Sequence, residues 1–245
     1  GADAERIISA LDARGKQAVT NVVIGAPRVE WRRDIEGRST NAPRYKLFNA
    51  ALGLGQAQGL VTKHHLVPFG DYVPLQDWLR GLIDFFDLPM SNATRGAAQQ
   101  DNVVLSLNGR LVQAAIGICY EIAYGNSMRK RAEQAGVLMT LTNDTWFGRS
   151  IGPHQHMQIA RVRALENGRW LLRAANDGIT GVVDHRGQIR AQLPQFVEGV
   201  LATSFQVMQG ATPYRLMGDW PLLIIIAGLI LAFRQRSLAD RAKIA

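Results

Sequence analysis

The sequence predicts an α/β fold, in which one α/β domain is followed by a single C-terminal transmembrane helix. Helical and strand-like patterns alternate from residue 4 to residue 205, with no internal repeat and no linker before residue 210. A charge-free apolar run then extends from Trp220 to Phe233. The chain has 245 residues, of which 47% are hydrophobic, so one domain of this size can bury a substantial core.

The first segments predict one helix followed by strands. Residues 4–16 have the amphipathic pattern of a helix, and the β-branched run over 18–27, ended by Gly and Pro, indicates a strand. Residues 44–55 and 59–66 indicate two more strands. The domain is therefore expected to open with a helix that leads into a sheet.

The next segment predicts a β-hairpin that ends at the only cysteine. Asn108 and Gly109 lie between two apolar runs within residues 103–120, and Asn-Gly is a strong signal for a two-residue hairpin turn. The second apolar run ends at Cys119. This cysteine is therefore expected at the C-terminal end of a strand, where α/β folds place reactive groups.

The rest of the domain continues the alternation of helices and strands. The expected elements are a helix over 127–135, a strand over 136–143, a helix over 154–169, and strands over 170–176, 179–189 (with a turn at Arg186-Gly187) and 199–205. This order is typical of one α/β domain.

The apolar run near the C-terminus predicts a membrane helix. The stretch from Trp220 to Phe233 is short for a bilayer core of about 30 Å, but it extends back to Leu216 with one charge, at Asp219. A tryptophan suits the membrane interface, and the basic residues after the run fit the positive-inside rule. The expected division is a non-cytoplasmic domain over 1–213, a transmembrane helix over 216–234 and a basic cytoplasmic tail over 235–245.

Composition limits the partners and cofactors. The formal net charge of +8 admits an anionic partner, either nucleic acid or an acidic membrane surface. The basic residues are scattered and form no zinc-finger or RNA-binding motif, so we expect no nucleic-acid partner. One cysteine excludes an intrachain disulfide and a cysteine-cluster zinc site. We expect neither a metal nor an organic cofactor.

Cys119 and Lys63 are the candidates for chemistry. A lone cysteine is most often structural, but the expected strand-to-helix turn is similar to a nucleophile elbow, which exposes its side chain. Lys63 lies among apolar residues on an expected strand, where a lysine usually extends its amine to the surface. An ammonium near a cysteine would instead favour the thiolate and stabilise a tetrahedral oxyanion. Spacing alone does not show whether the two meet.

The histidines offer an alternative. His64 and His65 lie on an expected strand, and any histidine close to Cys119 would form a Cys–His dyad. His154 and His156 fall on different faces of an expected helix, which suits a metal poorly. We interpret His154 and His156 as polar residues at a helix start.

Three stretches carry a family resemblance: LVTKHHLVPFGDYVPL, GICYE and LTNDTWFGRSIGPHQHMQIARVRALENGRWLLRAANDGITGVVDHRG. Together they resemble the apolipoprotein N-acyltransferases of the nitrilase, or carbon–nitrogen hydrolase, superfamily, over nearly the whole chain. The resemblance implies a nitrilase-like αββα sandwich and a Glu–Lys–Cys triad, with Lys63 as its lysine and Cys119 as its nucleophile. Tyr120 and Glu121 match positions that matter for activity, and Asp71 matches an acid that is more often Glu.

One member of the implied triad has no match. The family's glutamate would fall just before Gly1, whereas Glu5 lies in an expected helix and Glu30 lies in a different motif. The membrane helices that precede the soluble domain in the family also have no counterpart. We therefore expect a C-terminal fragment that is inactive alone.

The implied reaction is an acyl transfer at the bacterial inner membrane, with the catalytic domain in the periplasm. A membrane phospholipid acylates Cys119, and the thioester passes its acyl chain to the N-terminal diacylglyceryl-cysteine of an apolipoprotein. A membrane-tethered amidase, with water as the acceptor, and a non-catalytic membrane-anchored binding module remain alternatives. The aromatic segment 66–86 is expected to form either a lipid-facing lid or a packed loop.

Overall fold

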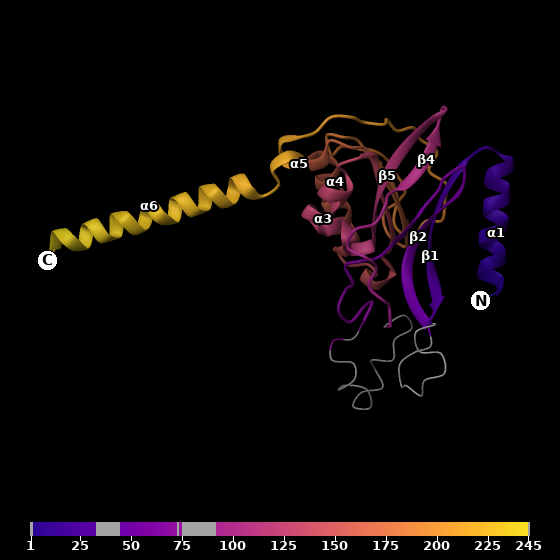
Figure 1. The fold of residues 1–245 in the computed structure, drawn as a ribbon, viewed down its shortest axis with the longest axis horizontal. Helices are drawn as coiled ribbons and strands as arrows, with labels where there is room; N and C mark the ends of the chain where they lie inside the picture. The colour runs from indigo at the N-terminus through magenta and orange to yellow at the C-terminus, as the bar shows by residue number, and fades with distance from the viewer. Residues whose placement is uncertain (1, 33–44, 73, 75–91, 245) are drawn as a thin grey trace.

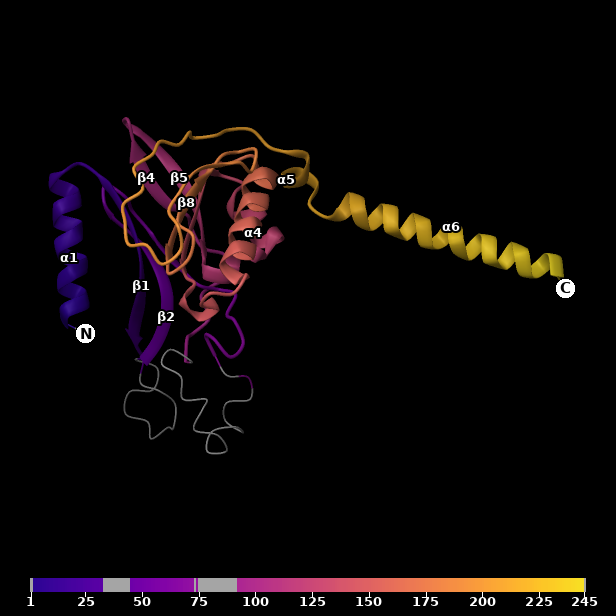
Figure 2. The same ribbon diagram turned by 180° about the vertical axis from the view of Figure 1, so that it is seen from behind.

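The structure, a computed structural model, describes residues 2–32, 45–72, 74 and 92–244. In this part of the chain the layers follow the order helix, sheet, sheet, helix (Figure 1, and from behind in Figure 2). One helix covers the outer face of a three-stranded sheet, and two helices cover the outer face of a six-stranded sheet. The αββα sandwich expected from the sequence is therefore confirmed.

The N-terminal part forms the outer helix and the smaller sheet. Its elements are α1 (Ala2–Gln17), β1 (Asn21–Trp31), β2 (Tyr45–Gly55) and β3 (Leu60–Thr62), and the strands are antiparallel in the order β1-β2-β3. The Gly55 amide donates a hydrogen bond of 2.8 Å to Asp12 Oδ1 of α1. A Cβ at Gly55 would lie 2.4 Å from the Thr20 carbonyl oxygen, so the close approach of helix and sheet requires glycine there.

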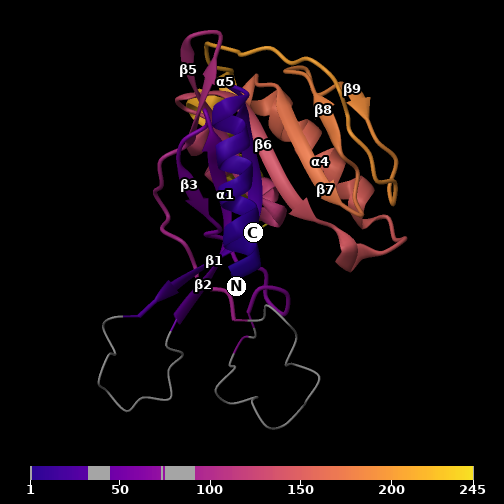
Figure 3. The same cartoon turned by 90° about the vertical axis from the view of Figure 1, so that its right-hand side faces the viewer.

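The larger sheet has antiparallel edges and a parallel centre. Its strands are β4 (Val103–Leu107), β5 (Arg110–Ile118), β6 (Ala135–Asn143), β7 (Leu171–Asn176), β8 (Gly181–Val183) and β9 (Ile189–Gln192). Because β5, β6 and β7 are parallel, their C-terminal ends meet at one edge of the sheet (Figure 3). That edge is where α/β folds collect functional groups.

Short turns and helices follow the parallel strands. They are η2 (Cys119–Ala123) and α3 (Gly125–Arg131) after β5, and η3 (Thr145–Phe147) and α4 (Gly152–Asn167) after β6. α4 carries Pro153 in its first turn and ends at Gly168, whose φ of 61° is a left-handed conformation that glycine adopts without strain. α3 and α4 lie on the outer face of the larger sheet (Figure 2).

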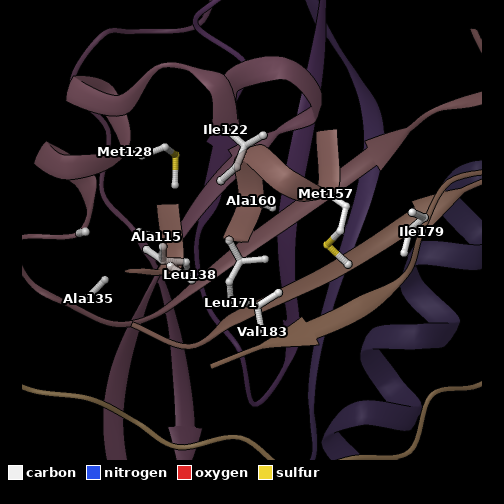
Figure 4. Close-up of a cluster of buried hydrophobic side chains, with 12 residues drawn as sticks. Ala115, Ile122, Met128, Ala135, Leu138, Met157, Ala160, Leu171, Ile179 and Val183 are labelled. Carbon is white, nitrogen blue, oxygen red and sulfur yellow. The ribbon is translucent and has the colours of Figure 1, made fainter. Parts of the chain in front are cut away.

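A hydrophobic row crosses the larger sheet beneath α3 and α4. Its members are neighbours on successive strands and are almost completely buried: Ala115, Leu138, Leu171 and Val183. Figure 4 shows them packed with side chains from the turns and helices, including Ile122, Met128 and Met157. Burial of one large aliphatic side chain is worth about 1.5–3 kcal/mol. This row therefore fixes which side of the sheet the helices cover.

The same face of the sheet becomes polar toward the strand ends. Two positions beyond the hydrophobic row, Gly117, Thr140 and Arg173 are neighbours on β5, β6 and β7. Side chains alternate between the faces of a sheet, so Thr140 and Arg173 point to the helix side as Leu138 does. A polar row thus lies one step from the functional edge.

Most expected elements are confirmed, with one exception among the strands. β4 and β5 form the expected hairpin, and Asn108 and Gly109 have φ values of 50° and 76°, as a type I′ turn requires. The strand expected over 199–205 is wrong, because its alternating apolar residues pair with no strand in the described part of the chain. Val200 in this segment is 94% exposed.

The C-terminal segment does not form the single helix expected over 216–234. It forms two helices, α5 (Pro213–Met217) and α6 (Trp220–Ile244). The expected span 216–234 is broken at Gly218, and the charge-free run Trp220–Phe233 covers only about 21 Å of a bilayer core of about 30 Å. Within the described residues, no helix combines the length and apolar character needed to cross a membrane. α6 instead projects away from the sandwich (Figure 1).

Candidate active site

Cys119 lies at the sharp turn between β5 and η2. It follows Ile118, the last residue of β5, and begins the 3-10 turn. Its φ of 53° falls in the left-handed region that non-glycine residues rarely occupy, and such strain is concentrated at functional sites. The residue is partly exposed. The expected strand-end position and the elbow-like turn are both present.

Glu121 joins this turn to the segment that carries Lys63. Its buried carboxylate accepts a hydrogen bond of 3.0 Å from the N–H of the residue before Cys119. It also accepts hydrogen bonds of 2.8 and 3.1 Å from the N–H groups of the two residues after Lys63. One carboxylate therefore holds the backbone next to the thiol and the backbone next to the ammonium together.

Lys63 turns inward instead of extending to solvent. The strand expected over 59–66 ends at Thr62, and Lys63 Nζ lies 2.5 Å from Asp71 Oδ2. The two side chains are only 2% and 11% exposed. Asp71 also accepts hydrogen bonds of 2.8 Å from the Asn49 side-chain amide and from a backbone N–H four residues earlier. Aspartate is thus long enough to pair with this lysine, although the resemblance leads one to expect glutamate.

Aromatic rings from two turns surround the same region. Tyr120 is 41% exposed, and the centroid of its ring lies 6.3 Å from that of Tyr124 and 6.2 Å from that of His156. From η3, the Phe147 ring lies 6.2 Å from His156, and the neighbouring Trp146 is exposed. These rings offer a partly exposed aromatic surface beside Cys119, as an apolar substrate requires.

A second buried polar cluster, which the sequence patterns did not reveal, also reaches Cys119. Asp144, directly after β6, pairs with Arg173 Nη2 at 2.6 Å and with His156 Nδ1 at 3.0 Å. The Thr142 hydroxyl donates a further hydrogen bond of 2.8 Å to the same carboxylate. On the other edge of its ring, His156 Nε2 lies 3.2 Å from the Cys119 carbonyl oxygen.

The negative charge of Asp144 is stabilised by the other members of this cluster. Burial alone would raise the pKa of Asp144, but the hydrogen bond from His156 and the positive charge of Arg173 outweigh burial and hold that pKa below its usual value. The Asp144 carboxylate is therefore ionised at neutral pH.

The chain matches one protein family over most of its length. Residues 16–214 match the model of the carbon–nitrogen hydrolase family. The chain belongs to the carbon–nitrogen hydrolase family.

Curated relatives of this chain are named apolipoprotein N-acyltransferases. The protein of that name from Pseudomonas aeruginosa PAO1 is 50% identical over 186 residues, which cover 76% of this chain and 36% of the relative. The Pseudomonas syringae pv. tomato protein is 44% identical, covering 86% of this chain and 39% of the relative. The Azotobacter vinelandii protein is 41% identical, covering 98% of this chain and 44% of the relative. The chain thus spans less than half the length of these relatives.

Solved structures of the family share the fold at low sequence identity. A carbon–nitrogen hydrolase from Helicobacter pylori G27 has a TM-score of 0.57 and 15% identity, covering 79% of this chain and 65% of that chain. The Caenorhabditis elegans NitFhit protein has a TM-score of 0.51 and 17% identity, covering 77% and 43%. At these identities the likeness concerns the fold alone.

The histidines in the described part of this chain do not form a dyad with the thiol. Among the described residues, no histidine ring is hydrogen-bonded to the Cys119 side chain. His65 stacks on Tyr124 at 4.1 Å; burial lowers the pKa of His65, and the charge of Glu121 only partly opposes that effect. His64 Nδ1 pairs with a backbone carbonyl at 2.8 Å.

The two histidines at the start of α4 differ from each other. His154 is exposed, as expected for a polar residue at a helix start. His156 is buried against the sheet and bound to Asp144, so the same expectation is wrong for His156.

The described part of the chain contains no group of three or more His, Cys, Asp or Glu residues suited to a metal ion.

A polar cavity of about 490 Å³ opens beside the turn after Cys119. It is lined by His65, from the segment after β3, and by residues of η2, α3, α4, α5 and their junctions, among them Tyr124, Glu166 and Asp219. Burial raises the pKa of Glu166; Arg163 lowers it, and the nearby carboxylate of Asp219 raises it further. The lid expected over 66–86 lies largely outside the described residues.

Proposed function

We propose that this chain is the catalytic part of an N-acyltransferase that moves an acyl chain from a membrane phospholipid to a bacterial apolipoprotein. The acceptor is the α-amino group of the N-terminal diacylglyceryl-cysteine. The observation that carries the proposal is the pairing of a strained cysteine turn with a buried lysine, held together by Glu121. The identity of 41–50% to proteins named apolipoprotein N-acyltransferase supports the choice of donor and acceptor.

In the first half-reaction, Cys119 takes the acyl group. A glutamate, which the resemblance puts upstream of Gly1, removes the thiol proton, and the thiolate attacks the ester carbonyl of the phospholipid. The ammonium of Lys63 and backbone N–H groups of the turn stabilise the tetrahedral oxyanion. The bond to the glycerol oxygen breaks, that oxygen recovers the proton from the glutamate, and a thioester and a lysophospholipid remain.

In the second half-reaction, the amine of the lipoprotein attacks the thioester. The glutamate takes a proton from the amine, Lys63 again stabilises the oxyanion, and the Cys119 thiolate leaves. An amide forms, the proton returns to the cysteine, and the site is ready for another donor. The two proposed half-reactions need no metal and no organic cofactor.

Lys63 is suited to this role because of its partner. Asp71 keeps the ammonium fixed inside the protein, and a compact ammonium retains further N–H donors that a developing oxyanion can use. Tyr120 and the neighbouring aromatic rings are proposed to contact the acyl chains. We propose that residues 1–213 form the catalytic domain without its N-terminal part, which would supply the glutamate.

The reaction is proposed to occur at the periplasmic surface of the inner membrane. Both substrates carry acyl chains, and moving each CH₂ group into water costs about 0.8 kcal/mol. A site that takes both substrates therefore works best at the bilayer surface. α6 supplies an exposed apolar run that fits contact with lipid, since most side chains of this run are more than half exposed.

An amidase in which water resolves the acyl-enzyme uses the same cysteine and lysine, and family membership also fits that reaction. The two functions are separated by the fate of the acyl group. The full-length protein is given a phospholipid donor with a labelled acyl chain, together with a synthetic diacylglyceryl-cysteine peptide. Label recovered in the peptide amide supports the transferase. Label recovered only as free fatty acid, at the same rate with and without peptide, supports the hydrolase.

A further inference from the structure

Arg173 is a buried positive charge, and one nitrogen of its guanidinium has no hydrogen-bond partner among the described residues. Its side chain is completely buried, and Nε donates a hydrogen bond of 3.0 Å to the Ile179 carbonyl oxygen. Nη2 bonds to Asp144, but Nη1 has no hydrogen-bond partner among the described residues. A buried donor without a partner is costly, and for a charged group the cost is larger. Such a group is expected to face a charge that forms during function.

Through His156 the network of Arg173 reaches Cys119: Arg173 Nη2 lies 3.2 Å from His156 Nδ1, and His156 Nε2 lies 3.2 Å from the Cys119 carbonyl oxygen. Arg173 lies in the polar row of the sheet that begins with Gly117, two residues before the cysteine. Burial lowers the pKa of Arg173 below its usual value, and the charges of Asp144 and Cys119 only partly oppose this effect. A guanidinium and a negatively charged sulfur attract each other.

His156 extends the same network to the backbone of the nucleophile. Nε2 of His156 lies 3.2 Å from the Cys119 carbonyl oxygen, which can only accept, so this contact is a hydrogen bond when Nε2 carries the proton. The opposite edge of the ring is held by Asp144, the carboxylate that also holds Arg173. The left-handed backbone of Cys119 is therefore fixed by a group that shares its anchor with the guanidinium.

We propose that Arg173 is a positioning residue for the nucleophile: anchored by Asp144, it stabilises the Cys119 thiolate from within the sheet, while His156 fixes the Cys119 peptide. This role rests on the proposed function only in taking Cys119 as the nucleophile. In this proposal, two cations stabilise two different negative charges. Lys63 acts on the oxyanion of the substrate, and Arg173 acts on the resting thiolate.

The experiment is alkylation of Cys119, which is the sole cysteine, in the purified chain at neutral pH. Two reagents of similar size are compared, neutral iodoacetamide and anionic iodoacetate. In Arg173→Met we expect iodoacetamide to react about tenfold more slowly, because the charge that stabilises the thiolate is lost. The reaction with iodoacetate should slow by a larger factor, because the positive charge of Arg173 also attracts this anionic reagent. Arg173→Lys keeps the charge and should retain the preference for iodoacetate.

Arg169→Met is the matched control. Arg169 is also buried, but its guanidinium binds backbone carbonyls of Ala135 and Gly210, away from the thiol. This variant should lose stability and keep both alkylation rates. If Arg173→Met does not fold, Arg173→Gln replaces it, because a glutamine removes the charge and can still hydrogen-bond to Asp144.

The outcomes separate this role from the proposed function. A folded, uncharged variant at Arg173 that reacts at the wild-type rate with both reagents would overturn the role of Arg173 alone. Equal slowing by both reagents, without rescue in Arg173→Lys, would also overturn it, because that result indicates a purely structural residue. In the full-length protein, a Cys119 no more reactive than free cysteine would instead contradict the nucleophile itself.

Discussion

Two buried ion pairs serve the nucleophile turn, and they are built in different ways. Lys63 and Asp71 are eight positions apart and meet at 2.5 Å within one loop region. Arg173 and Asp144 are 29 positions apart and meet at 2.6 Å, with Arg173 inside β7 and Asp144 just after the parallel strand β6. The first pair is slightly open, with Asp71 11% exposed, whereas both members of the second pair are completely buried.

The two pairs therefore have different roles. The Lys63–Asp71 pair takes part in the chemistry, and the Arg173–Asp144 pair holds the structure around the nucleophile. The lysine is a compact cation with donors to spare, so a substrate oxyanion can use its charge. The arginine is held in a network with a carboxylate, an imidazole and a backbone carbonyl, so its position is fixed before substrate binds. Removal of one partner from a buried pair leaves an uncompensated charge, which typically costs about 3–5 kcal/mol. Loss of the lysine should therefore reduce mainly the rate, and loss of the Arg173–Asp144 pair mainly the stability.

The largest effect is expected when the group that both pairs serve is removed. Cys119→Ala in the full-length protein should abolish acyl transfer, and Cys119→Ser should also lose turnover because a hydroxyl is far less ionised than a thiol at neutral pH. Transfer of labelled acyl chains to a diacylglyceryl-cysteine peptide measures this loss. An undiminished rate in Cys119→Ala would contradict the whole mechanism.

The next effect tests the chemical role of the first pair. Lys63→Ala should reduce the rate of acyl transfer by about 10²–10³, the usual cost of losing an oxyanion donor. Lys63→Arg should not restore it, because a planar guanidinium does not fit the place of an ammonium beside Asp71. Near-normal rates in Lys63→Arg would mean that only general positive charge is needed at this site.

The second pair is tested by stability and its dependence on pH. Asp144→Asn should destabilise the fold by about 3–5 kcal/mol near pH 7, since Arg173 loses its counter-charge. The folded-state pKa of Asp144 lies below its usual value, so the stabilisation is present above the unfolded-state pKa of about 4 and is lost as the pH falls. Urea unfolding at several pH values should show the gap between wild type and variant closing in acid. A gap that is independent of pH would rule out ionic stabilisation.

The carboxylate of Glu166 should affect the stability of the fold in the opposite direction from that of Asp144, and its effect should be the smallest of those predicted here. Burial and Asp219 raise the folded-state pKa of Glu166, so its ionised form destabilises the fold, and stability falls as the pH rises through the unfolded-state and then the folded-state pKa. Glu166→Gln should therefore raise the melting temperature at neutral pH, by no more than about 2–4 °C. Asp144→Asn, measured in parallel, should lower it. A lower melting temperature in Glu166→Gln would mean that its pairing with Arg163 outweighs burial.

The residues of the first pair were matched through the family resemblance, but their contact was not predicted, and neither was any part of the second pair, for a physical reason. Lys63 and Asp71 lie in one contiguous motif and Cys119 follows an apolar strand, yet sequence spacing does not show which of these side chains meet. Arg173 and His156 each look like surface residues in a strand or helix pattern. Only the strand register and the orientation of α4 turn them toward Asp144. One local signal for this cluster was present, because Asp144 follows a strand as Cys119 does.

The fold was predictable where periodicity alone decides the structure. The hairpin at Asn108 and the alternation of helices and strands follow from local patterns. The strand over 199–205 was wrong, and the membrane helix over 216–234 is not supported, because both depend on context. Residues 199–205 join neither sheet in the described part of the chain, and the expected membrane span is interrupted at Gly218.

The most direct test is whether Cys119 carries the acyl chain. The full-length protein is incubated with a phospholipid of defined acyl composition, without acceptor, and is digested for mass spectrometry. The peptide that contains Cys119 should gain the mass of one acyl chain. Hydroxylamine should remove it, and the diacylglyceryl-cysteine peptide should discharge it. A protein that transfers acyl chains to the acceptor while Cys119 stays unmodified at every time point would contradict the thioester mechanism.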